Sequence, residues 1–194
     1  MTIDLLSSAT GILVTRILNV MEKFKRRGFV LERKDLGRGV YAIKDSLRWR
    51  EAKDSLSSEE FSLFVERLTN FYEQKDTRDE ETKIILAELY KYTSINLERL
   101  EIIKEVADLF NKGPNKLKAV EYYDCIIKYF EKKEPRTEKE IELFLESIIA
   151  KTFTLMHKMA AQQQIDLLKK AKDIAEKNNL FEKLALISLR LARA

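Results

Sequence analysis

The stretch Gly28–Trp49, GFVLERKDLGRGVYAIKDSLRW, contains the clearest β-strand pattern in a chain of 194 residues that is otherwise patterned as helix. Two short runs of β-favouring residues, Phe29–Leu31 and Val40–Ile43, flank a basic segment that contains Gly37 and Gly39. Glycine readily adopts the positive φ angles that a tight reversal of the chain needs. The stretch therefore predicts a β-hairpin.

The residues before this hairpin are patterned as two short helices. Apolar residues recur at helical spacing in Ile3–Ala9 and again in Leu13–Phe24. Gly28 follows three basic residues, which is typical of a helix end. Two helices followed by a hairpin form the second part of a winged helix, so we expect residues 1–56 to form a partial winged helix without its first helix. A further helix is expected at Asp45–Leu56.

The composition is that of a globular protein built from long helices. Apolar residues make up 45% of the chain and charged residues 35%, while five Gly and two Pro leave little material for turns. The sequence has no apolar run of membrane-spanning length and no signal-peptide pattern at Met1, so we expect a cytoplasmic protein without a membrane partner. Cys125 is the single cysteine, which excludes an intramolecular disulfide.

The rest of the chain, residues 57–194, is patterned as a series of helices with short links. Three capping-box sequences, at Ser57–Glu60, Thr77–Glu80 and Thr137–Glu140, predict helix starts. Helices are expected at 59–75, 79–93, 96–111, 115–132, 137–159, 163–178 and 180–193. Short links between helices of this length favour antiparallel hairpins stacked in a helical-repeat array.

One window of this array matches the pattern of a tetratricopeptide repeat. The matching positions alternate between small or aliphatic and aromatic residues: Ala107, Phe110, Ala119, Tyr123 and Ile126. Alanines let two helices approach closely, and aromatic rings fill the space where the helices diverge. A weaker match includes Leu168 and Ala171. The predicted fold is therefore mainly α: a partial winged helix with one β-hairpin, followed by an antiparallel array similar to tetratricopeptide repeats.

Two tyrosines are candidates for a surface that binds a protein partner. Tyr122 and Tyr123 are adjacent on one predicted helix, and we expect only one of them to point inward. Tyr122 is expected to line a concave surface that holds a peptide or a partner helix, and Tyr92 is the second candidate.

Basic residues are concentrated in the hairpin region. Residues 1–56 contain twelve Lys and Arg against seven Asp and Glu, whereas the remainder is almost balanced. The candidate nucleic-acid contacts are Arg16, Lys23, Lys25, Arg26, Arg27, Arg33, Lys34 and Arg38. A winged helix binds DNA by placing its last helix in the major groove and its wing against the backbone. Thr15 and Asn19 are further polar residues on that helix. The other interpretation is that these charges are solvated or contact another domain.

The hairpin region also resembles the carboxy-terminal winged helix of STAND-class P-loop ATPases, particularly the archaeal group. The residues that match the pattern of that family are Tyr41, Ile43, Asp45, Leu47 and Arg48. Ser46 stands where the family has proline. In such proteins a tetratricopeptide-like superhelix that senses a partner often follows the winged helix. The resemblance implies a regulatory region in which the array binds a protein partner and the winged helix relays this to a nucleotide-binding domain.

The sequence contains no combination of residues that is typical of an enzyme active site. The chain contains no G-x-x-x-x-G-K-[ST] segment that would bind a nucleotide phosphate. His157 is the single histidine, and it is expected on a different helix from Cys125. We therefore predict no catalytic residue, no cofactor and no metal site.

Two functions remain open from the sequence. The first is the non-enzymatic regulatory and protein-interaction region of a STAND-type ATPase. The alternative is a winged-helix DNA-binding transcriptional regulator with a helical sensing or dimerisation domain. The sequence does not indicate an oligomeric state.

Overall fold

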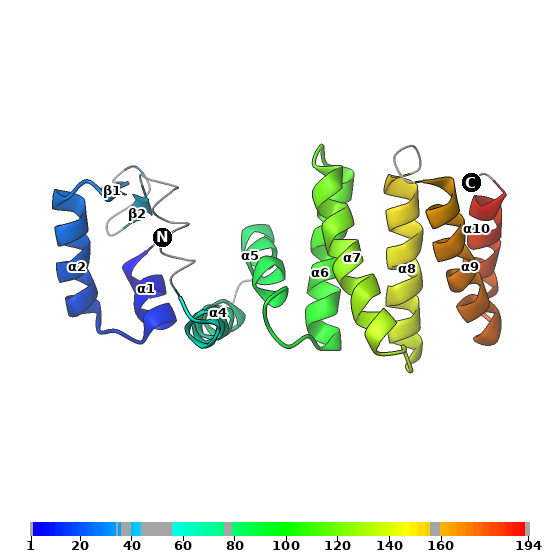
Figure 1. Ribbon diagram of the computed structural model, residues 1–194, viewed down its shortest axis with the longest axis horizontal. Coiled ribbons are helices and arrows are strands. Elements are labelled where there is room, and N and C mark those ends of the chain that lie inside the picture. Colours follow the sequence, from blue (N-terminus) through cyan, green and yellow to red (C-terminus); the bar gives the residue numbers. More distant parts are fainter. Residues whose placement is uncertain are drawn as a thin grey trace. The chain divides into compact units, whose positions relative to one another are not determined.

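The computed structural model describes residues 2–33, 35, 40–43, 56–75, 79–155 and 160–192. Within these ranges the chain forms nine α-helices and one antiparallel β-hairpin, which confirms the predicted mainly α fold with a hairpin and a helical array (Figure 1). The chain divides into two compact units, Met1–Thr82 with Glu88–Ser94 and Lys83–Ala87 with Ile95–Ala194. The first unit thus extends past the expected boundary at residue 56. Most of the predicted helix Asp45–Leu56 lies outside the described residues.

The first unit combines three helices with the hairpin. Its elements are α1 (Ile3–Thr10), α2 (Val14–Arg26), β1 (Val30–Glu32), β2 (Tyr41–Ile43) and α4 (Ser58–Glu73). Strand pairing places Leu31 opposite Ala42. Thr2, the residue just before α1, forms an isolated antiparallel bridge with Val40, the residue just before β2.

The C-terminus of α2 ends as its sequence predicts. Gly28 has a φ of +73°. Its amide donates to the carbonyl of Lys25, and the amide of Phe29 donates to the carbonyl of Phe24, which are the two hydrogen bonds of a Schellman motif. The rings of Phe24 and Phe29 meet edge to face at 6.0 Å, adding the apolar contact typical of this motif. The turn directs the chain from α2 into β1.

A small apolar core holds the first unit together. It is formed by Ile3 of α1, Ile17 and Met21 of α2, Val30 of β1 and Tyr41 of β2, each at most 8% exposed. Ile17 and Met21 are four residues apart and therefore lie on the same face of α2. Their burial sets the rotation of α2 about its axis.

The helix α4 supplies a third helix to this unit. α4 contacts α1, and Arg67 of α4 donates a hydrogen bond from Nη1 to the carbonyl of Thr10, at 2.6 Å. This carbonyl lies at the end of α1, where Gly11 adopts a φ of +69°. A Cβ at Gly11 would lie 2.9 Å from the Arg67 guanidinium. Glycine fits this position because it adopts the positive φ readily and because it has no side chain to clash with Arg67.

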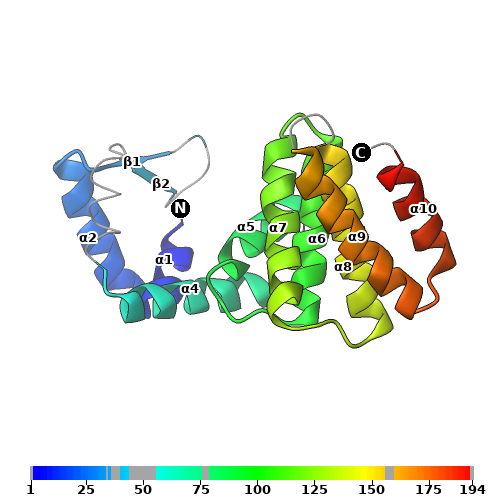
Figure 2. The same ribbon diagram turned by 45° about the vertical axis from the view of Figure 1, so that its right-hand side comes forward.

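The second unit is a stack of antiparallel helices. It contains α6 (Leu97–Lys112), α7 (Lys116–Lys132), α8 (Glu138–Thr154), α9 (Ala161–Lys177) and α10 (Phe181–Leu191), whereas α5 (Glu80–Tyr90) is shared between the units. Each helix from α6 onward contacts the next, and α6 also contacts α8. Figure 2 shows α6 to α10 side by side. The helices begin within two residues of their predicted positions.

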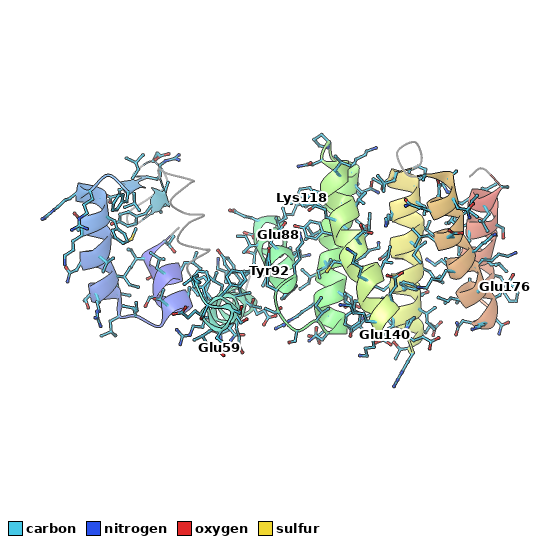
Figure 3. The ribbon with its side chains drawn as sticks, in the orientation of Figure 1. Glu59, Glu88, Tyr92, Lys118, Glu140 and Glu176 are labelled. Atoms are coloured by element: carbon cyan, nitrogen blue, oxygen red, sulfur yellow. The ribbon has the colours of Figure 1, made fainter. Side chains whose placement is uncertain are left out.

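Two of the three predicted capping boxes are confirmed. At α4 the amide of Glu60 donates to Oγ of Ser57, and the amide of Ser57 donates to the Glu60 carboxylate. The same pair of bonds joins Thr137 and Glu140 at the start of α8, where Figure 3 labels Glu140. Backbone amides that donate to the Glu140 carboxylate lower its pKa.

The capping box predicted at Thr77–Glu80 begins at a residue outside the described ones. Asp79 is the N-cap of α5, and its Oδ1 accepts a hydrogen bond from the amide of Thr82 at 2.7 Å. Asp is among the residues preferred at this position. Hydrogen bonds from Thr82 lower the pKa of Asp79.

The α6–α7 pair is packed as the repeat pattern predicts. Ala107 of α6 and Ala119 of α7 are fully buried, as are Tyr123 and Ile126. Phe110 is half-buried. In the weaker window, Leu168 and Ala171 of α9 are also fully buried. Small residues are therefore enclosed within the helix stack, where they permit close packing.

Replacing the buried alanine tests this packing. Ala107→Leu should destabilise the chain by about 1–3 kcal/mol, because the enclosed site has no room for three extra carbon atoms. Thermal unfolding followed by circular dichroism should show a lower Tm by several degrees. Ala185→Leu, at an exposed position of α10, is the matched control and should have little effect. An Ala107→Leu variant as stable as the parent would contradict this packing.

Candidate nucleic-acid interface

The helix α2 buries Ile17 and Met21 in the core of its unit and exposes a basic face. Opposite the core residues lie Arg16, Asn19, Lys23 and Arg26, at spacings of three, four and three residues. Such spacing brings side chains to one side of a helix. All four are exposed, and so is Arg27, which follows at the C-cap. We call Arg16, Asn19, Lys23, Arg26 and Arg27 the basic face.

The cations of this face are not neutralised by the protein. Within the part of the chain that the structure describes, Arg16, Lys23, Arg26 and Arg27 form no ion pair. Four positive charges therefore face solvent along one side of one helix. A concentration of cations like this attracts a polyanion and is the electrostatic pattern of a nucleic-acid-binding surface.

Helix electrostatics explains only part of this arrangement. Arg26 and Arg27 lie at the C-terminus of α2, where cations interact favourably with the helix dipole. Arg16 lies in the first turn, where the dipole favours an anion and a cation is unfavourable. The position of Arg16 therefore does not stabilise the helix, which favours a role in binding.

Two other predicted contacts are paired with carboxylates. Lys25 donates to Oε2 of Glu32 at 2.5 Å, and this bond raises the pKa of Lys25. Arg33 forms an ion pair with Asp35 at 2.6 Å, which lowers the pKa of Asp35. Both cations have an anionic partner within the first unit, so they are weaker candidates than the basic face. Lys34 and Arg38, the remaining predicted contacts, lie outside the described residues.

The prediction that Tyr122 lines an open surface is wrong. Tyr122 and its neighbour Tyr123 are both fully buried. α7 contacts both α6 and α8, so it can enclose adjacent side chains on different flanks. Tyr122 stacks on Phe110 with ring centroids 5.8 Å apart, and Tyr123 donates its hydroxyl hydrogen bond to Oδ1 of Asp108 at 2.7 Å. Burial and the adjacent carboxylate raise the pKa of Tyr123.

Tyr92 is exposed but belongs to the first unit. Its side chain is 55% exposed, and its ring contacts Phe61 of α4 edge to face at 5.4 Å. Figure 3 labels Tyr92, which follows α5 in the chain. Residues 88–94 are part of the unit that carries the hairpin. Tyr92 is therefore no part of the α6–α10 stack on which a partner surface was predicted.

The array also exposes an aromatic residue that was not predicted from the sequence. Phe153 of α8 is 51% exposed, and the guanidinium carbon of Arg190 in α10 lies 4.2 Å from its ring centroid. Nearby on the same two helices, Lys183 pairs with Glu146 at 2.5 Å. Phe153 lies off the buried stripe of α8, and a helical projection of that segment could have identified it.

The described residues contain no group of three or more His, Cys, Asp or Glu side chains placed to hold a metal ion. His157 lies outside these residues, and Cys125 is half-buried on α7. No single described helix is long and apolar enough to cross a membrane.

The chain was also compared with protein-family models, with curated proteins and with solved structures, and none of the three comparisons gave a match. The resemblance to STAND-class ATPases stays a prediction.

Proposed function

We propose that the chain is a non-enzymatic regulatory protein whose first unit binds duplex DNA through the basic face of α2. Its helical array would serve as the sensing or protein-binding part. One observation carries the proposal: four cations without ion pairs lie on the side of α2 opposite the core of its unit.

The dimensions of this face suit a DNA duplex. Arg16 and Arg26 are ten residues apart, which corresponds to about 15 Å along the helix at 1.5 Å per residue. An α-helix fits the major groove, and this length spans about four base pairs at 3.4 Å each. Each Lys or Arg that contacts a phosphate releases counterions, so binding should weaken as salt is added.

A lipid surface fits the same charges less well. A helix that lies in a membrane interface inserts its apolar face among the lipids while its polar face stays in water. In α2 the centre of the apolar face, Ile17 and Met21, is already packed in the core of the unit. Val14, Leu18 and Phe24 on the flanks of this face are each 40% exposed, so the test below includes anionic vesicles.

Removing the four charges should abolish most of the DNA affinity. A variant with Arg16, Lys23, Arg26 and Arg27 changed to Gln should bind a labelled duplex at least tenfold more weakly in a fluorescence anisotropy titration. Between about 50 and 200 mM salt, the logarithmic salt slope should lose about 0.9 for each phosphate contact removed.

A control variant with the same change in net charge shows whether DNA binding depends on the basic face or on general electrostatic attraction. Lys128, Lys132, Lys169 and Lys177 are exposed residues of the array without ion pairs among the described residues. Changing these four to Gln should leave the DNA affinity within about twofold. Equal loss in both variants, absence of DNA binding, or binding to anionic vesicles in place of DNA would contradict the proposal.

The second candidate function is the protein-interaction region of a STAND-type ATPase. It is favoured by the order of a hairpin unit followed by a helical array and by the exposed ring of Phe153, which contacts the guanidinium of the half-buried Arg190. Aromatic and arginine side chains are enriched at protein interfaces. In this function the α8–α10 face would bind the partner.

Site-specific cross-linking tests this second candidate. A photoreactive phenylalanine analogue at position 153 should give a discrete protein adduct in cells. The same analogue at position 117, an exposed site on α7, is the control and should give none. Equal adducts at both positions, or none at 153, would contradict a partner surface on α8 and α10.

A further inference from the structure

Asn19 occupies the centre of the basic face. It lies three residues after Arg16 and four before Lys23, and its side chain is exposed. In the part of the chain that the structure describes, its amide forms no hydrogen bond and caps no helix. Both the donor and the acceptor of this amide are therefore available to a ligand.

Stability gives no reason for asparagine at this position. Asparagine is a weaker helix former than the Lys, Arg, Glu or Gln residues that suit an exposed helical site. Its side chain is also absent from the apolar core, which uses Ile17 and Met21. The residue costs helix stability, and a binding role would explain its presence.

The surrounding cations and the amide have different chemistry toward DNA. Lys and Arg side chains bind phosphates, and these contacts fix the position of a helix without reading sequence. A primary amide can accept a hydrogen bond from N6 of adenine and donate one to N7, a pair that only adenine presents in this geometry in the major groove. A face with cations around one amide can therefore both anchor the helix and select a base.

We propose that Asn19 is a specificity-determining residue that selects an adenine in the major groove, held in register by Arg16 and Lys23. This inference rests on the proposed binding of duplex DNA by α2. It adds a base preference that charge alone would not give.

The test is selection of binding sites from a duplex pool with a randomised segment. The parent chain should enrich adenine at one position by about five- to 150-fold over the other bases, the range expected for a bidentate contact. Asn19→Ala should lose this enrichment. Its affinity for the unselected pool should stay within about twofold and its salt slope should be unchanged, because no phosphate contact is removed. Asn70→Ala, at an exposed site of α4, is the matched control and should retain the enrichment.

The outcomes separate this inference from the function on which it rests. Salt-dependent DNA binding without adenine enrichment, or with enrichment that survives in Asn19→Ala, would overturn the role of Asn19 and leave the DNA-binding proposal standing. A parent chain that binds no duplex would overturn both. Circular dichroism of Asn19→Ala should match the parent, so that lost selection is not caused by unfolding.

Discussion

The burial of Ile17 and Met21 against α1 and the hairpin is the constraint on which the rest of the first unit depends. A helix with two buried residues one turn apart cannot rotate without exposing them, and each would lose about 1.5–3 kcal/mol of burial energy. The rotation therefore holds Arg16, Asn19 and Lys23 toward solvent. The Schellman turn at Gly28 ends α2 and joins it to the strand that completes the core. Fold and candidate interface thus follow from the same amphipathic segment.

The charges of the array contrast with those of α2. Several cations of the array pair with carboxylates on other helices: Lys104 and Lys183 both pair with Glu146, and Lys151 pairs with Asp124. The side chains of Lys104 and Lys151 are only 13% and 14% exposed, and each pair neutralises charge locally. On the basic face no described carboxylate neutralises the cations. Exposed lysines without ion pairs also occur on the array, so the proposed DNA-binding role depends on the grouping of four cations on one side of α2.

Local chemistry made much of the fold predictable from the sequence. The hairpin, the end of α2 at Gly28 and the starts of α4 and α8 each depend on residues close together in the chain. Features that depend on distant neighbours were not predictable. α4 joins the hairpin unit through Arg67, and Tyr122 is buried because α7 contacts helices on two sides. The basic residues were identified, but which of them pair with Glu32 or Asp35 depends on side-chain geometry, even for Arg33 and Asp35, which are close together in the chain.

The central claim is that the exposed side of α2 binds a nucleic acid while Ile17 and Met21 stay packed in the core of the first unit. Backbone amide spectra of the ¹⁵N-labelled chain during titration with a short duplex would test it most directly. If α2 binds DNA, the largest changes in chemical shift should occur from Arg16 to Arg27, and core residues such as Val30 should change little. Residues of α6 to α10 should change no more with the duplex than they do with a non-specific polyanion used as a control. Changes confined to the array, or an α2 that is unaffected at saturating duplex, would contradict the account.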